Sequence, residues 1–367
     1  MQTDVLVIGG GPAGLATAIA AALRGLRVAV ADPRTPPIDK ACGEGLLPEG
    51  VASLRALGME IGSGAGIEFR GISFRDEHSS ASAGISRGKA FGVRRTTLHR
   101  LLTIRAVELG VRLLWGARVS DLGFRGVLID GGLIKFKWLV GADGQHSSVR
   151  KFAGLDSTKL PRARFGFRRH YAVAPWSDLV EVRWGRRCQM VCTPTSAEEV
   201  CISFFTSDPA LRIERALTQF PDIARRLGGA EITSAEAGAV TSLSRARVVV
   251  RGNVALVGDA SCTVDGIAGQ GLSLAFLQAL ALGDALACGD LASYERAHVR
   301  ITRTATNMAR LLLLMDASSA LRRKVLRLFA ARPALFSKMM SIHTGETPAH
   351  DLNAASVLQL GWNVLWA

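Results

Sequence analysis

The chain has 367 residues, 48% hydrophobic and 21% charged, so it is long enough for two interlocked domains with folded cores. Its net charge of +14 is compatible with a basic solvated surface, an anionic cofactor, a membrane surface or an acidic substrate. Nucleic acid is not expected as a partner, since the sequence has neither zinc-ligand spacing nor basic stretches interleaved with aromatic residues. Its six cysteines include no CxxC pair and predict neither a disulfide framework nor a metal site.

The first element is an almost wholly apolar stretch, residues 5–23. No basic region precedes it and a glycine cluster interrupts it, so it predicts a buried strand, a turn and a buried helix rather than a signal peptide or a membrane span. The turn has the GxGxxG spacing at Gly9, Gly11 and Gly14, with Pro12 and Ala13 between them. Glycines at these positions allow the tight turn, the approach of a pyrophosphate and close helix–strand packing, and the helix N-terminus favours the phosphates.

A second strand, residues 28–31, ends in Asp32. An acid about twenty residues after such glycines accepts hydrogen bonds from an adenosine ribose. Strand, glycine turn, helix, strand and terminal acid together predict dinucleotide binding. At this point they do not distinguish NAD from FAD.

Three later segments again join a regular element to a polar turn. The segment VRRTTL at 93–98 begins an amphipathic helix that runs to about Glu108, and a strand from Trp138 leads into GADG at 141–144. A further strand ends in Gly258 and Asp259, and a glycine-rich turn at 266–271 opens a long apolar helix over about 272–286.

The order and spacing of these segments resemble the para-hydroxybenzoate hydroxylase-like superfamily of FAD-dependent oxidoreductases, which includes flavin monooxygenases and geranylgeranyl reductase-like flavoproteins. The resemblance implies non-covalent FAD. It places Asp143 near the pyrophosphate and the nicotinamide approach path, although a helix cap would also explain this acid. It assigns Arg95 to FAD, with Arg94 as a close rival.

The same resemblance assigns the second polar turn to the flavin end of the cofactor. Asp259, after Gly258, would bind the ribityl chain. The turn at Gly269, Gln270 and Gly271 would aim the following helix N-terminus at the flavin, where its dipole stabilises the anionic reduced form.

The fold class that follows is α/β, with a Rossmann-type FAD-binding domain (glutathione reductase-like), an interleaved antiparallel β-sheet substrate domain and a C-terminal helical segment. The expected FAD-binding parts are residues 1–72, 93–160 and 246–295. The expected substrate-domain parts are residues 73–92 and 161–245, and residues 296–367 form the helical region.

The loop at 39–48 resembles the K-x-C-G-x-G-L pattern of geranylgeranyl reductases and their bacterial relatives. The resemblance places this loop beside the flavin, where Cys42 and Gly43 would contact the cofactor. Gly43 and Gly45 would let the backbone lie flat near the ring. Cys42 is either a functional thiol or a small side chain packed on the ring, and Cys42 and Glu44 are the candidate catalytic proton donors.

The reaction type is less sharply indicated. Residues 261–265 (SCTVD) resemble the reductase pattern, whereas Gly269-Gln270-Gly271 matches the hydroxylase form of the turn. We expect a flavoprotein monooxygenase of secondary metabolism acting on a hydrophobic aromatic, polyketide or isoprenoid substrate. The alternative is a reductase of C=C double bonds. A halogenase, whose tryptophan motif we do not find, and a non-catalytic flavin-binding protein rank lower.

The reductant is expected to be NADPH or NADH, bound transiently because no separate domain for it is visible, or a separate flavin reductase or other electron donor. The segment 165–173 (FGFRRHYAV) predicts a substrate-domain strand, in which Arg168, His170 and Tyr171 are candidate substrate-binding residues. Half of the side chains on such an alternating strand face solvent, which is the simpler explanation for some of them.

From about Leu291 onward the pattern is helical, with basic amphipathic stretches at 321–329 and 335–340. These helices either pack on the core with a solvated basic face or contact an anionic membrane peripherally. The cysteine usage favours a cytoplasmic protein, which such a contact would place at the inner membrane face. The apolar stretch 357–366 predicts packing against a partner surface.

Overall fold

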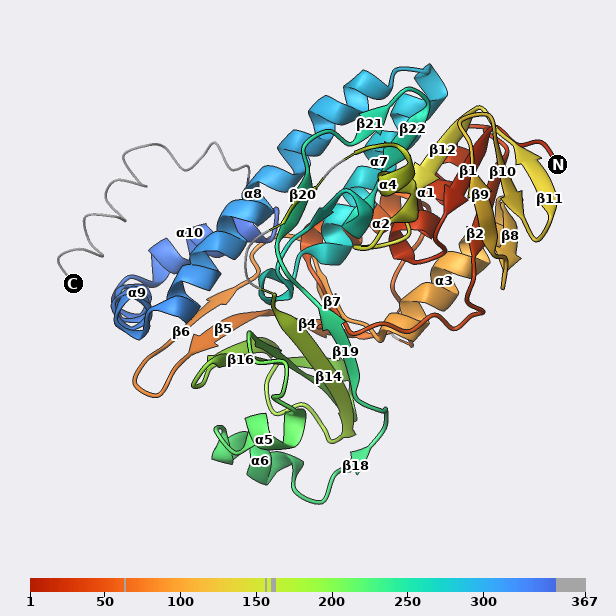
Figure 1. Ribbon diagram of the computed structural model, residues 1–367. Coiled ribbons are helices and arrows are strands. Elements are labelled where there is room, and N and C mark those ends of the chain that lie inside the picture. The colour runs from red at the N-terminus through yellow and green to blue at the C-terminus, as the bar shows by residue number, and fades with distance from the viewer. Residues whose placement is uncertain (63, 156, 160–162, 348–367) are drawn as a thin grey trace.

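The computed structural model describes residues 1–347 except 63, 156 and 160–162. Two sheets dominate it (Figure 1), one carrying the N-terminal glycine turn and one lying beside it with helices α5 (Ile213–Leu217) and α6 (Pro221–Leu227) on its far side.

The first sheet has six strands in the order β21-β22-β12-β1-β2-β8. The pairs from β22 to β8 are parallel, and only the short β21 joins antiparallel. Its central strand β1 is buried throughout, as its β-branched sequence predicts. The strand bounds are β1 Val5–Ile8, β2 Val28–Asp32, β8 Arg112–Trp115, β12 Trp138–Gly141, β21 Val250–Arg251 and β22 Val254–Leu256.

Helices and a small sheet complete this unit. Helix α1 (Pro12–Ala22) packs on α7 (Gly271–Cys288) and on α3 (Arg95–Glu108), and α2 (Pro48–Ala56) packs on α7. The small antiparallel sheet contains β9 (Val119–Leu122), β10 (Gly126–Ile129) and β11 (Gly132–Lys135). Short elements near the cavity described below are β3 (Gly45–Leu46), β4 (Ile67–Phe69), β7 (Ala90–Gly92), α4 (Ser148–Phe152), η1 (Gly258–Ala260) and η2 (Gly266–Ala268).

The second sheet has the order β18-β14-β17-β16-β15-β5-β6, with β19 also paired to β14. Side chains alternate between its two faces. One face packs on α5 and α6 through residues such as Met190, Ile202 and Phe204, and the other presents Val191 and Phe205 to the interior of the molecule. The strand bounds are β5 Gly71–Arg75, β6 Ser80–Gly84, β14 Phe165–Ala172, β15 Leu179–Trp184, β16 Cys188–Ser196, β17 Glu199–Thr206, β18 Glu231–Ile232 and β19 Ala237–Val240. Strands β13 (Ser157–Lys159), β20 (Ser244–Ala246) and β23 (Cys262–Thr263) form a connecting sheet.

Three helices end the described chain: α8 (Leu291–Ala317), α9 (Ser319–Ala331) and α10 (Pro333–His343). Asp290 and Ser318 cap α8 and α9 by accepting hydrogen bonds from backbone amides. Within the described residues, α7 alone is long and apolar enough to cross a membrane, but it packs against α1, α2 and α8, so we assign it to the core.

The expected fold class is confirmed, with a Rossmann-type unit, an antiparallel-rich second sheet and C-terminal helices. The domain boundaries stay predictions. Strand β5 begins at Gly71 and therefore crosses the boundary expected between residues 72 and 73. The apolar stretch 357–366 lies outside the described residues.

Candidate active site

A cavity of about 640 Å³ runs between the two sheets and is walled by both. What we call its nucleotide half is formed by the glycine turn and polar side chains: Gly9, Gly11, Pro12, Ala13, Asp32, Arg34, Arg95, Asp143, Gly258 and Asp259. Its apolar half lies under the second sheet and against α8 and α10: Phe69, Ile72, Phe74, Val180, Val182, Val191, Phe205, Leu312 and Met340. This size and mixture are typical of a site for a small molecule with one polar and one apolar part.

The glycine turn is a cradle that tolerates no side chains at two positions. Gly9 has φ +109°, and a Cβ there would lie 2.3 Å from the carbonyl oxygen of Ala142. A Cβ on Gly14 would lie 1.8 Å from the carbonyl oxygen of Gly9, so this glycine permits helix–strand packing without lining the cavity. Gly11 precedes α1 with no side-chain cap, so the amides of the first turn remain for an anion.

Asp32 ends β2 at the cavity wall as a carboxylate. It accepts hydrogen bonds from the amides of Gly10 (2.8 Å) and Arg34 (2.9 Å) and from Arg34 Nε (3.1 Å). Burial by itself would raise the pKa of Asp32, but the hydrogen bonds from Arg34 and Gly10 outweigh it and the pKa is lowered. The acid is thus charged and fixed in the position that the sequence predicts for a ribose contact.

The structure separates the two rival arginines before Leu98. Arg95 lines the cavity, and its Nε is buried with no hydrogen-bond partner among the described residues. Arg94 points elsewhere, forming an ion pair with Glu199 (Nε–Oε1 2.8 Å) and a hydrogen bond to Thr233 Oγ1 (2.9 Å). An unpartnered guanidinium nitrogen beside a glycine cradle fits a phosphate ligand.

The two later motifs meet at the same half of the cavity. Asp143 Oδ2 accepts from Ser148 N (2.7 Å) at the start of α4, so the acid does act at a helix N-terminus, while its Oδ1 is buried without a partner among the described residues. Arg150 joins the motifs by donating to the carbonyls of Gln145 (2.6 Å) and Ala260 (2.8 Å).

Asp259 also lines the cavity, and Lys40 of the 39–48 loop donates to it at 2.7 Å. Gly258 has φ +62°, as the turn before Asp259 requires. Gly269 and Gly271 line the cavity at the start of α7, but Gln270 does not. Its side-chain amide donates to the backbone carbonyl of His343 instead.

The 39–48 loop brings both predicted catalytic residues to the wall. Burial raises the pKa of the Cys42 thiol, which is therefore protonated, and its Sγ accepts from Glu44 N (3.3 Å). Glu44 has the left-handed φ of +60° and is held there by hydrogen bonds from Arg95 N to Oε1 (2.9 Å) and from Val93 N to its carbonyl (2.9 Å). Backbone strain of this kind is often found at functional sites.

The predicted substrate residues on β14 fare differently from one another. His170 Nε2 contacts Glu44 Oε2 at 2.5 Å and its Nδ1 contacts Ser234 Oγ at 2.7 Å, so this side chain positions Glu44. Arg168 lines the cavity, with its guanidinium paired to Asp39 (2.5 Å). The assignment of Tyr171 to the substrate pocket is wrong, because strand alternation turns it to the other face, among Ile202, Phe204 and the α5–α6 layer.

Glu44, His170 and Cys201 form a buried cluster whose ligand-type atoms lie within 4.8 Å of one another. Glu44 and His170 already satisfy each other, and burial raises the pKa of the Cys201 thiol well above its usual value. We therefore assign the cluster to a hydrogen-bond network.

His343, at the end of α10, is a further candidate that the sequence pattern did not indicate. It lines the cavity, donates a ring hydrogen bond to the backbone of Ala268, and has an Nδ1 without a partner among the described residues. Burial lowers the pKa of His343 to about 4, so the ring is neutral at physiological pH. It lies where the turn before α7 meets the apolar half. A lone histidine on an apolar helix was the only signal in the sequence.

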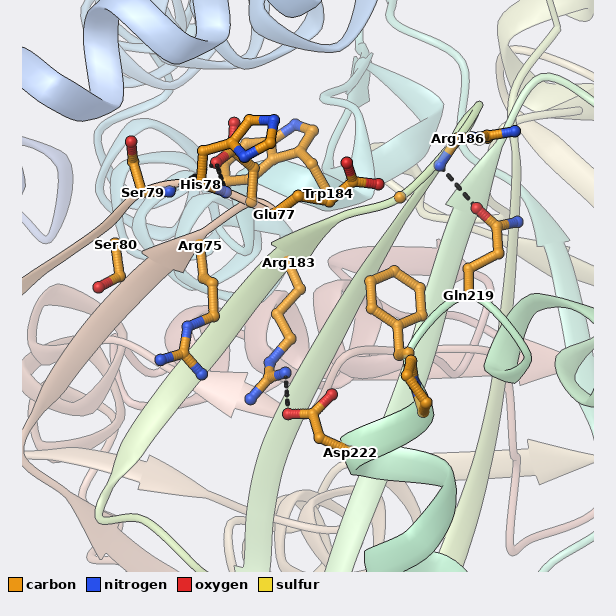
Figure 2. Close-up of a pocket in the computed structure, with 14 residues that line it drawn as sticks. Arg75, Glu77, His78, Ser79, Ser80, Arg183, Trp184, Arg186, Gln219 and Asp222 are labelled. Carbon is orange, nitrogen blue, oxygen red and sulfur yellow. Dashed lines mark hydrogen bonds and ion pairs between the residues drawn. The ribbon is translucent and has the colours of Figure 1, made fainter.

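A second cavity, of about 660 Å³, lies at the end of strands β5 and β15 beside α6. Figure 2 shows Arg183 paired to Asp222 (2.6 Å) and the backbone amide of Arg186 donating to the side chain of Gln219 (2.6 Å). It contains none of the predicted site residues, so we place the chemistry in the first cavity.

The chain is similar to known proteins in sequence and in fold. The sequence profile of the family described as "FAD binding domain" matches residues 2–293. The menaquinone reductase of Mycolicibacterium smegmatis is 34% identical over 166 residues, covering 42% of this chain and 40% of that protein. The 6-methylpretetramide 4-monooxygenase of Streptomyces rimosus is 32% identical over 178 residues, covering 43% and 42%. This chain thus matches less than half the length of either relative.

Among solved structures, a flavoprotein/dehydrogenase from Cytophaga hutchinsonii superposes with a TM-score of 0.81 at 16% identity, over 100% of both chains. At this identity the likeness shows the fold alone. The glycine cradle and the unpartnered donor Arg95 Nε fit an FAD pyrophosphate, and the fit rests on these groups.

Proposed function

This chain belongs to the FAD binding domain family, and on that premise we propose that it is an FAD-dependent oxidoreductase, more closely a monooxygenase acting on a hydrophobic substrate that carries a hydroxyl group. When bound, the flavin supplies electrons to oxygen. In the overall reaction a substrate C–H bond, O₂, NAD(P)H and a proton become C–OH, water and NAD(P)⁺. The immediate electron donor is NADPH, NADH or a separate reductase.

The observation that carries the proposal is the neutral His343 at the junction of the two halves. Its free Nδ1 accepts a hydrogen bond from a hydroxyl group on an aromatic ring of the substrate. This contact holds the ring carbon next to the hydroxyl toward the flavin. Electron donation from that hydroxyl makes the carbon reactive toward an oxygen electrophile. The apolar half excludes water, which would otherwise waste the activated oxygen.

The other residues act on the cofactor side. Asp32, Arg95 and Asp259 would hold FAD through the ribose, the pyrophosphate and the ribityl chain. Glu44, fixed by His170, shapes the loop beside the flavin. If the protein is a monooxygenase, Cys42, which is protonated and lines the cavity, packs against the flavin ring.

A second candidate, reduction of a C=C bond, is favoured by that same thiol. Hydride addition to one alkene carbon must be completed by a proton on the other, and a protonated Cys42 at the cavity wall is suitably placed to supply it. The similarity to a menaquinone reductase supports this alternative, and the similarity to a 6-methylpretetramide 4-monooxygenase supports the first.

Mass spectrometry distinguishes the two reactions. The purified flavoprotein is incubated with NADPH or NADH, isotopically labelled O₂, and either an alkyl hydroxyquinoline or a menaquinone. We expect one labelled oxygen atom in the hydroxyl-bearing product and none in the menaquinone. A gain of two hydrogens without label that persists after any quinol is reoxidised to the quinone would replace the proposal by the reductase, and reductant consumption with neither product would reject both.

A further inference from the structure

The outer face of α8 carries a stripe of arginines. Exposed side chains recur there at intervals of three and four residues, the period of one helix face: Arg296, Arg300, Arg303, Asn307, Arg310 and Leu314. The stripe is about 27 Å long. Exposed basic residues continue on the next two helices at Arg323, Arg327 and Lys338.

Negative charge does not balance this stripe. Within the described parts of α8, α9 and α10 the acidic side chains are Glu295 and Asp316. Glu295 accepts from the amide of Val249 (3.0 Å), and Asp316 is paired to Arg164 (2.8 Å), so both are engaged with the body of the protein. Arg296 pairs with Asp290 at 3.6 Å, while Arg300, Arg303 and Arg310 have no ion-pair partner among the described residues.

Two further features favour a lipid surface over other anionic partners. Leu314 and Val299 lie on the outer side of α8 with 57% and 44% of their surfaces exposed. Apolar side chains among arginines suit the boundary between headgroups and acyl chains, whereas a nucleic acid would offer them nothing. In addition, the inner faces of α8 and α10 close the apolar half of the cavity through Leu312 and Met340.

We propose that the outer face of α8, continued by α9 and α10, docks on a bilayer that contains anionic phospholipids (Figure 1). Each basic residue near such a surface contributes attraction that adds along the stripe and is screened by salt. Docking places the helices that wall the apolar half at the source of lipophilic molecules. That consequence alone rests on the proposed function; the docking does not.

The test is co-sedimentation of the full FAD-loaded chain with vesicles, in the absence of substrate. We expect binding to phosphatidylcholine vesicles that contain phosphatidylglycerol, weak binding to phosphatidylcholine alone, and release by salt. The triple variant Arg300→Glu, Arg303→Glu, Arg310→Glu should lose at least about 100-fold in vesicle partitioning. A matched control, Arg112→Glu, Arg118→Glu, Arg125→Glu, changes the net charge equally at exposed positions near β8 to β10 and should keep binding.

Equal loss in the two triple variants would show a response to net charge and overturn the docking face. Wild-type protein that ignores anionic vesicles but binds double-stranded DNA or an acidic protein would also overturn it. Retained FAD absorbance checks the fold of each variant, and a milder Arg→Gln triple at 300, 303 and 310 replaces the Glu variant if that one loses flavin. Turnover of detergent-dispersed substrate should be unchanged in the α8 variant, so failure of docking and failure of the proposed reaction are separable.

Discussion

The nucleotide half and the apolar half of the cavity are built by different means. In the nucleotide half, backbone geometry does most of the work: glycines at Gly9 and Gly14 exclude any Cβ, and a helix N-terminus supplies amides. In the apolar half, side chains from strands and helices distant in sequence meet to form the wall. In the first half, substitution at a few positions should therefore be strongly disruptive. In the second half, each of many side chains should contribute less, so single substitutions should be better tolerated.

The largest effect is expected from adding a single Cβ atom at Gly14 in the first half. A Cβ on Gly14 would meet the Gly9 carbonyl oxygen at 1.8 Å, which only movement of α1 away from β1 can relieve. We expect Gly14→Ala to abolish FAD retention and to lower the yield of folded protein, as flavin absorbance and circular dichroism would show. Gly62→Ala, where a Cβ meets nothing within 4 Å, is the matched control. Full FAD occupancy in Gly14→Ala would refute the cradle.

The second prediction concerns how the stability of the protein depends on pH, because two histidines on the helices of the second half are buried. Burial lowers the pKa of His298 and of His343 to about 4, from 6.5 for a free side chain. The unfolded chain therefore binds more protons between about pH 4 and 6.5, and the free energy of unfolding rises with pH through that window.

Each histidine contributes on the order of 3 kcal/mol to the total change in the free energy of unfolding across this window. Because His298 contacts Ser261 Oγ at 3.0 Å, a glutamine can keep a polar contact there. In His298→Gln, thermal stability should fall less steeply below pH 6.5 than in wild type. At pH 8 the stability of the variant should be close to that of wild type. An unchanged pH profile in this variant would show that His298 is not the group responsible.

The next prediction separates a cofactor contact from a loop contact in the nucleotide half. Asp259 pairs with Lys40 at 2.7 Å, both half-exposed, and also lines the cavity. Asp259→Ala should weaken FAD binding by about 10–100-fold, the range expected for a lost charged hydrogen bond. Lys40→Ala should weaken it much less. Flavin fluorescence titration measures both, and a larger loss in the Lys40 variant would assign the cofactor contact to the lysine.

The contrast between the halves also explains what the sequence alone could predict. Local signals identify the nucleotide half, because a strand, a glycine turn and a helix that follow one another within a few residues form the motif by themselves. The Glu44–His170 contact was not predictable, since it joins residues 126 positions apart through the approach of the loop to β14. Tyr171 was misplaced for a related reason. Alternation shows that neighbours on a strand face opposite ways, but not which way is inward.

The smallest expected effect tests that last point within the apolar half. His343→Asn removes the free ring acceptor while keeping a polar side chain, and it should raise the KM for a hydroxyl-bearing substrate by about 2–10-fold, as for one hydrogen bond. Tyr171→Phe removes a hydroxyl on the far face of the sheet and should leave both KM and kcat unchanged. For an analogue whose hydroxyl is methylated, wild type and His343→Asn should have equal KM values, because the acceptor then has no donor to bind. A KM effect of Tyr171→Phe that His343→Asn does not share would assign substrate recognition to Tyr171 on β14 and not to His343.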